Sequence, residues 1–348
     1  MQHEITTNGP LLDENGHVVE AGYARSLIKN YDRKAIKAGK YRIKEWDYYL
    51  IYNDEYGIAL TLDDNSYMGL ISVSVLDFKH KREKTVSPMQ WFTKGKRNFP
   101  SSSKSGDVSY DNKKSKKRVQ MGFYHENGAR RLKTTLDNFY EKLTFECDLL
   151  LEDEPQDSMV IVTPFKEKKT AFYYNQKIVG FKVSGFFRIG DYKYEFSKED
   201  TRAILDWGRG VWTYKNTWYW GAATKNINGH EVGFNIGYGF GDTSNASENV
   251  VFYDGVLHKL EDVSFNIPKN EKGKLEYLKP WTFTSSDKRF EMDFTPILNR
   301  KSKTDVLIIC SDQNQVFGYF NGYIILDDNT KIEVKNMLGF AERVFNKW

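Results

Sequence analysis

The sequence lacks the short motifs that would assign it directly to a large enzyme class. It contains no G-x-x-x-x-G-K-[ST], G-x-S-x-G, H-E-x-x-H or C-x-x-C segment, so no motif supports a phosphate-binding loop, a serine hydrolase, a zinc protease or a dithiol centre. The glycines from Gly237 to Gly241 lack the dinucleotide-binding spacing. With two cysteines and six scattered histidines, we expect neither a cofactor nor a bound metal.

Long apolar runs and proline are also scarce. No window approaches eighteen apolar residues and the first sixteen residues are polar, so we expect an unexported, cytoplasmic protein. Cys147 and Cys310 are then reduced by default, with a single disulfide as the alternative. The net charge of +4 over 348 residues implies no global electrostatic partner.

Aromatic residues are abundant, at 15% of the chain against only eight prolines, and this composition favours sheet. Period-two runs bounded by turn residues predict well over a dozen strands. The Asn175-Gln176-Lys177 segment is interpreted as a break between strands. Short helices are predicted at 24–37 and, from a capping-box pattern, at 197–205, while 335–348 forms either a helix or an extended strap.

This pattern predicts a mainly β protein with two antiparallel β-barrels or sandwiches and few short helices. We place the first domain at 1–195 and the second at 196–348.

A tryptophan- and glycine-rich stretch, 206–259, stands out within the second half. Side chains alternate between the two faces of a strand, so Val232 to Phe240 presents one apolar face and one glycine face interrupted by Asn235. Glycine inside a strand marks close approach of a ring, a backbone or a ligand. Trp218 and Trp220 would lie over this glycine face. The stretch is either a tightly packed barrel wall or the floor of a ligand site.

A hairpin follows at Asp254-Gly255, because Asp-Gly is a strong two-residue turn signal. It pairs Tyr253 with Val256 and Val251 with His258. Asn249, Tyr253 and His258 then share one face and, with Asn235, are candidate polar groups in an apolar cavity. Glu248 lies diagonal to Lys259, which allows a cross-strand ion pair as its simplest explanation.

Residues 79–118 carry thirteen Lys or Arg residues against three acids. We interpret this segment first as a solvated face. Docking on an anionic membrane surface is the alternative, and nucleic acid is the less favoured partner.

Several motifs together resemble the bacterial family catalogued as domain of unknown function 2804. They are Trp207-Gly-Arg-Gly-Val-Trp212, Asn216-Thr-Trp-Tyr-Trp-Gly221, the glycine stretch Gly233 to Asp242, Glu248-Asn249 and Gly339-Phe-Ala-Glu342. The resemblance implies a distant likeness to two-domain lipocalin-like (calycin) proteins such as carotenoid hydratase and tocopherol cyclase. It also implies a ligand cavity within one barrel or near the junction of the two barrels. No catalytic residue of those enzymes can be matched to a position in this sequence.

We therefore expect a hydrophobic or aromatic small molecule as ligand, with catalysis undecided. If the protein is an enzyme, cofactor-free hydration, cyclisation or isomerisation would need a buried acid, and indoles would stabilise a developing cation. The candidate catalytic residues are Asp206, Glu248 and His258. The candidate ligand-binding residues are Trp207, Arg209, Trp212, Trp218, Trp220, Asn235, Tyr238, Asn249 and Tyr253. Arg209 would either position a polar head group or stack on Trp212. A non-catalytic lipid carrier or sensor, or a sugar-binding protein, needs the same walls without the acid.

Overall fold

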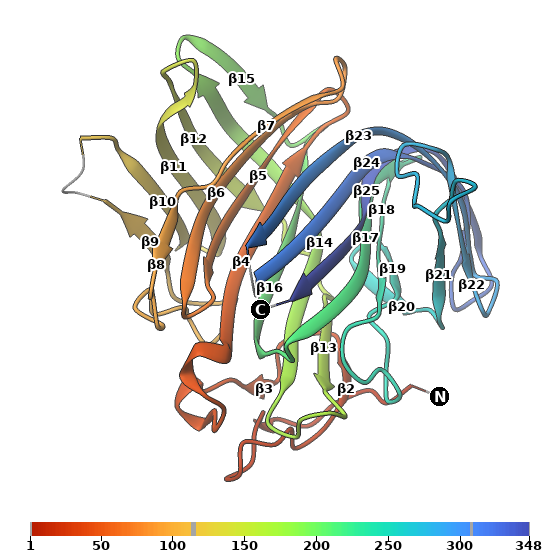
Figure 1. Cartoon of the computed structure of the whole chain (residues 1–348). Helices are drawn as coiled ribbons and strands as arrows, with labels where there is room; N and C mark the ends of the chain where they lie inside the picture. The colour runs from red at the N-terminus through yellow and green to blue at the C-terminus, as the bar shows by residue number, and fades with distance from the viewer. Residues whose placement is uncertain (1, 113–115, 307–308, 348) are drawn as a thin grey trace.

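Two curved antiparallel sheets form the molecule (Figure 1). The computed structural model describes residues 2–112, 116–306 and 309–347. Lys113 and Lys114 of the basic segment lie outside these residues. Within them, helix is limited to two single 3-10 turns, η1 (Arg33–Ala35) and η2 (Lys40–Arg42). The mainly β prediction is confirmed.

The first sheet has fourteen strands and the order β7-β6-β5-β4-β16-β14-β12-β11-β10-β9, with β2, β8, β13 and β15 paired beside this path. The strands are β2 (Gly22–Ala24), β4 (Ile43–Tyr52), β5 (Tyr56–Asp64), β6 (Met68–Asp77), β7 (Arg82–Val86), β8 (Met89–Trp91), β9 (Val108–Asp111), β10 (Val119–Glu126), β11 (Ala129–Tyr140), β12 (Leu143–Glu152), β13 (Met159–Pro164), β14 (Phe172–Ile189), β15 (Tyr192–Phe196) and β16 (Arg202–Val211). Side chains bring the two margins of this sheet together, because Gln90 Nε2 donates to the Tyr110 hydroxyl at 3.0 Å.

The second sheet has nine strands in the order β20-β19-β18-β17-β25-β24-β23-β22-β21. The strands are β17 (Lys215–Ile227), β18 (His230–Tyr238), β19 (Val250–Tyr253), β20 (Val256–Lys259), β21 (Val263–Asn266), β22 (Trp281–Ser285), β23 (Phe290–Val306), β24 (Ile309–Ile325) and β25 (Lys331–Lys347). Near the N-terminus, β1 (Gly9–Pro10) and β3 (Lys29–Asn30) form a separate parallel pair. The predicted hairpin register is confirmed, since Tyr253 pairs with Val256 and Val251 with His258.

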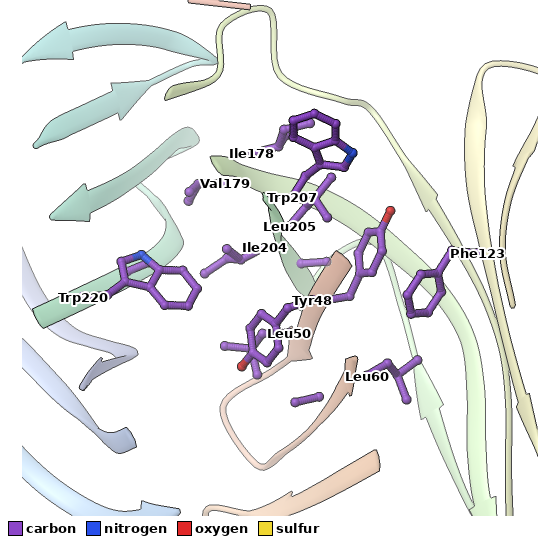
Figure 2. Packing of buried hydrophobic residues seen from close by; sticks show 14 of the residues in the cluster. Tyr48, Leu50, Leu60, Phe123, Ile178, Val179, Ile204, Leu205, Trp207 and Trp220 are labelled. Atoms are coloured by element: carbon purple, nitrogen blue, oxygen red, sulfur yellow. The ribbon is translucent and has the colours of Figure 1, made fainter. Parts of the chain in front are cut away.

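The hydrophobic core has two parts. One fills the first sheet and continues across the junction to Trp220 and Phe340 of the second sheet. The other fills the concave side of the second sheet with side chains such as Phe234 and Trp281. Figure 2 shows how the central strands of the first sheet separate two packed layers, with Trp207 on one side and Trp220 on the other.

Both helix predictions are wrong, and the ambiguous C-terminal tail is a strand. Residues 24–37 form β3 and one 3-10 turn, whereas β16 begins at Arg202 inside the predicted second helix. The capping-box residues Ser197 and Asp200 form only a turn, closed by the bond from Thr201 N to Ser197 O at 2.9 Å. Residues 202–211 are buried throughout and lie between β14 and β4, so burial on both faces outweighs the local helix signal.

The chain passes from the first sheet to the second between Val211 and Lys215. β16 therefore belongs to the first sheet, although the sequence placed the division after residue 195. That the two sheets fold as separate domains stays a prediction.

The close packing of β4 on β16 leads to a first mutational prediction. A methyl group on Gly208 would lie 1.9 Å from Trp46 Cζ2, so Gly208→Ala must displace the indole and is expected to lower the free energy of unfolding by roughly 1–3 kcal/mol. Gly39→Ala is the matched control, because no atom lies within 4 Å of the added methyl. Urea denaturation measures both variants, and equal stabilities would contradict the packing argument.

Candidate functional site at the sheet junction

Two rows of cross-strand neighbours face each other where the sheets meet. In the first sheet, Asp206 pairs with Lys177 on one side and with Tyr48 on the other. In the second sheet, one row runs across four strands through Gly237, Trp220, Glu342 and Gln315. Directly paired residues project from the same face of a sheet. Each row therefore forms a line of side chains on one face, and the two lines meet where the sheets pack together.

Lys177 forms the first contact between the rows. Its ammonium lies 2.8 Å from Asp206 Oδ1 and 3.9 Å from the centre of the Trp220 ring system. Only 3% of the Lys177 side chain is exposed. Asn175 Nδ2 also donates to Asp206 Oδ1, at 2.5 Å. Asp206 is therefore held by a cation and an amide, while Lys177 places its charge against an indole face, where cation–π attraction is favourable.

Trp220 connects this pair to Glu248. Its Nε1 donates to Asn235 Oδ1 at 2.7 Å, and Asn235 Nδ2 donates to the Glu248 backbone oxygen at 2.9 Å and to its Oε2 at 3.3 Å. A methyl group on Gly237 would lie 2.6 Å from Glu248 Oε1. The glycine face of β18 thus leaves room for a carboxyl group, and the expected close approach at these glycines is made by protein side chains.

Glu342 occupies the centre of the second row. Its Oε1 accepts a hydrogen bond from Trp218 Nε1 at 3.0 Å, and its Oε2 accepts one from Gln315 Nε2 at 3.1 Å. Gln315 also lies 3.4 Å from the Tyr48 hydroxyl. Burial raises the pKa of Glu342 to about 7, and the bond from Trp218 only partly offsets that effect.

The carboxyl groups are electrostatically coupled. Burial raises the pKa of Glu248, while Lys177 and the Asn235 amide act to lower it. The charge of Lys177 also acts to lower the pKa of Glu342, and that of Asp206 acts to raise it. Asp206, Glu248 and Glu342 thus share the charge of Lys177, while Arg300 acts in addition on Glu342 and Lys259 on Glu248. A buried excess of carboxyl groups favours retention of a proton, in line with the raised pKa of both Glu248 and Glu342.

An aromatic cluster adjoins these polar groups. Trp212 makes edge-to-face contacts with Trp46, Trp218 and Phe240, with ring centres 4.9–5.6 Å apart. Tyr173 stacks on Trp46 and contacts Phe240. Trp46 and Trp218 keep part of their surface in solvent. The acid cluster therefore lies beside an apolar, partly accessible wall.

Five of the sequence-predicted site residues meet at this junction. They are Asp206, Glu248, Trp218, Trp220 and Asn235, and Trp212 stands next to them through its contact with Trp218. The proposed Glu248–Lys259 ion pair is not the arrangement observed, since the Lys259 ammonium donates to Ser247 Oγ and to the backbone oxygens of Asn249 and Leu260.

Trp207 lies on the opposite face of β16 (Figure 2), and Arg209, two positions further along the same strand, shares that face. Arg209 is fully buried, donates to Asp47 Oδ1 at 2.9 Å and to the Pro100 carbonyl, and lies 4.1 Å from the Trp207 ring centre. The predicted alternative of stacking on Trp212 is wrong, because the Arg209 guanidinium lies over the rings of Phe99 and Trp207.

The other predicted residues are distributed over the second sheet. Tyr238 stacks on Tyr219, with centres 4.5 Å apart, and Tyr253 stacks on His230 at the surface. His258 Nδ1 lies 3.1 Å from Asp327 Oδ2. The Asn249 side-chain amide accepts a hydrogen bond from Gly237 N and donates one to the Glu261 carbonyl. It therefore satisfies two backbone groups in place of a neighbouring strand. These residues do not join Asn235 in one polar group.

Lys177, Glu342, Gln315 and Tyr48 were missed as site residues. Lys177 lies in the interior of β14, where Asn175-Gln176-Lys177 is part of one continuous strand. Three consecutive polar residues inside an apolar run signalled a buried polar patch instead of a turn. Glu342 stood in one of the family-like motifs, but its neighbours come from strands far away in sequence.

Among the described residues, no group of three His, Cys, Asp or Glu side chains is arranged to hold a metal ion. In the same part of the chain, no helix combines the length and apolar character needed to cross a membrane.

Comparisons with known proteins place this geometry in a family. A search of curated proteins gave no match. Among solved structures, an AttH candidate from Nitrosomonas europaea superposes with a TM-score of 0.56 at 13% identity, over 92% of this chain and 98% of that one. Kievitone hydratase from Nectria haematococca gives a TM-score of 0.47 at 11% identity, over 87% of this chain and 88% of the other. The first likeness concerns the fold alone. The model of domain of unknown function 2804 matches residues 2–348, and the chain therefore belongs to that family.

Proposed function

We propose that the protein binds a small hydrophobic molecule at the sheet junction and transfers a proton to it without a cofactor. The observation that supports this proposal most directly is Glu342, a buried carboxyl whose pKa is raised to about 7 beside Trp218 and Lys177. A general acid works best when its pKa lies near the working pH.

In the proposed reaction, Glu342 donates its proton to a carbon–carbon double bond. The new C–H bond leaves a cationic carbon, and the face of Trp218 stabilises this charge by cation–π attraction. In hydration, water adds its oxygen to this carbon and passes a proton to the Glu248 carboxylate. In cyclisation, a hydroxyl group of the substrate adds its oxygen to the carbon and passes its proton to Glu248. In isomerisation, a neighbouring C–H bond gives its proton to Glu248 and its electron pair forms the new double bond. Hydration, cyclisation and isomerisation thus share the first step.

A non-catalytic carrier is the second candidate function. Both oxygens of Glu342 already accept hydrogen bonds, as in a structural network that holds the sheets together. A carrier would retain the same ligand without changing it.

Deuterium incorporation tests the proton-transfer step. Small molecules extracted from the purified protein are identified by mass spectrometry and then incubated with fresh protein in D2O. The wild-type chain is expected to produce a product with one carbon-bound deuterium. Glu342→Gln should reduce this rate by on the order of 10²–10⁴-fold, because proton transfer by a positioned side chain contributes that much.

Glu333→Gln is the matched control, since Glu333 lies on the same strand with 69% of its side chain exposed. It should retain full activity. Ligand retained by wild type, Glu342→Gln and Glu333→Gln without exchange would instead support the carrier. If wild type and a Trp218→Ala, Asn235→Leu double variant retained the ligand equally well, binding at the junction would be excluded.

A further inference from the structure

An exposed patch of aromatic and basic side chains lies at the margin of the first sheet, where β8 and the loop after it pack against the loop that contains η2. It consists of Lys40, Tyr41, Trp91, Phe92, Lys94 and Lys96, and we call it the aromatic–basic patch. Tyr41, Trp91 and Phe92 are 53%, 63% and 60% exposed. Three large aromatic side chains with most of their surface in water are costly to maintain unless they contact a partner.

The two loops that supply the patch are in contact. Lys94 Nζ lies 5.3 Å from the centre of the Tyr41 ring and 5.9 Å from that of Phe92. A methyl group on Gly95 would lie 2.6 Å from Arg33 Nε, so residues 33–44 and 91–97 pack directly on one another. Tyr41, Phe92 and Lys94 therefore form one surface, and Lys40, Trp91 and Lys96 are exposed beside them in the two loops.

The backbone holds the exposed rings in place. Phe92 and Lys94 have left-handed conformations, with φ of 56° and 50°, which are unfavourable for bulky side chains. Phe92 N donates to the Tyr67 carbonyl at 2.7 Å and Lys94 N to the Ser66 carbonyl at 2.9 Å. Strained backbone that is held by surrounding bonds is concentrated at functional positions.

Basic residues dominate the two loops that supply the patch. Residues 33–44 and 91–97 contain nine Lys or Arg residues and no Asp or Glu. Arg33 is paired with Glu45, whereas Lys40, Lys94 and Lys96 are exposed. An acidic surface would complement these lysines.

We propose that the aromatic–basic patch docks the protein on an anionic membrane surface. Tryptophan, tyrosine and phenylalanine insert into the interfacial zone of a bilayer, and lysines near it are attracted to anionic lipid headgroups. The proposed docking surface is smaller than the basic segment 79–118 and only partly overlaps it. The patch combines residues 91–96 with a second loop from much earlier in the chain. It also includes exposed aromatic rings, which a purely electrostatic binding surface would not need.

Co-sedimentation with lipid vesicles tests the proposal on the full-length chain. The protein should bind vesicles of 30% phosphatidylglycerol in phosphatidylcholine and show weak binding to pure phosphatidylcholine. Trp91→Ser/Phe92→Gly should lower the partition constant at least tenfold, and glycine suits the φ of Phe92. Lys40→Gln/Lys94→Gln should lower it by roughly 30-fold, because each lysine near the surface contributes about 1 kcal/mol, which is about fivefold in the partition constant.

Two exposed positions outside the patch provide controls. Tyr192 is 71% exposed and the Lys335 side chain is 79% exposed, so Tyr192→Ala and Lys335→Gln should bind like wild type. Circular dichroism confirms that each variant is folded. Absence of vesicle binding by wild type, or equal binding by the Trp91→Ser/Phe92→Gly variant, would overturn the proposal. Binding to a single-stranded oligonucleotide without vesicle binding would assign the patch to nucleic acid instead.

Discussion

Replacing Arg209 by methionine is expected to lower the free energy of unfolding by roughly 3–5 kcal/mol, which is the usual cost of leaving a buried charge without its partner. The Arg209 side chain is completely buried and lies 2.9 Å from Asp47 Oδ1. It also donates through two nitrogens to the Pro100 carbonyl. The substitution therefore leaves a buried carboxylate and a buried carbonyl without these donors. Urea denaturation monitored by circular dichroism measures the effect.

A second substitution separates charge from packing. Asp47→Asn in the Arg209→Met background should recover part of the lost stability, because it removes the uncompensated carboxylate. Arg188→Met is the control for an arginine in an exposed ion pair, since its side chain is 49% exposed beside Glu146. That variant should change stability by less than about 1 kcal/mol. Equal losses for Arg188→Met and Arg209→Met would show that burial does not determine the effect.

The stability of the fold should also depend on pH through Glu342. Its pKa rises from 4.5 to about 7 on burial, so the folded state binds a proton more tightly than the unfolded chain. The resulting stabilisation is fully present below pH 4.5 and is lost as the pH rises through 7. Each pKa unit corresponds to about 1.4 kcal/mol, which makes the total loss roughly 3 kcal/mol.

Unfolding experiments at several pH values on wild type and Glu342→Gln isolate this contribution. The difference in free energy of unfolding, wild type minus variant, should fall between pH 4.5 and 8. Glu333→Gln should show no fall in this window, because hydrogen bonding to Lys335 lowers the pKa of Glu333. A constant difference for Glu342→Gln would mean that the Glu342 carboxyl stays ionised in the folded protein, and Glu342 would then not serve as the proton donor.

The proposed site depends on an alignment of two sheets that no local pattern describes. Period-two alternation correctly separated the glycine face of β18 from its apolar face, and the Asp-Gly turn correctly set the register of β19 and β20. Alternation within one strand contains no information on which other strand faces it. The pairing of Trp220 with Glu342 joins residues separated by more than a hundred positions.

The helix errors have a related cause. Ser197 and Asp200 do make a local hydrogen bond, at 3.1 Å, so the capping signal was physically real but described only a turn. The residues after it are buried on both faces between β14 and β4. The free energy of this burial exceeds the small differences in helix propensity among the residues concerned.

By itself the sequence determined the β class, the strand faces, the tight turns and the family, because each depends on residue type and short spacing. Tertiary structure alone decided that Lys177 reaches Asp206 and Trp220, that Arg209 is buried against Trp207 and paired with Asp47, and that Glu342 is buried among donors. Side-chain pKa and hydrogen bonding depend on neighbours brought together by long-range strand pairing, and those neighbours are set by the packing of the two sheets.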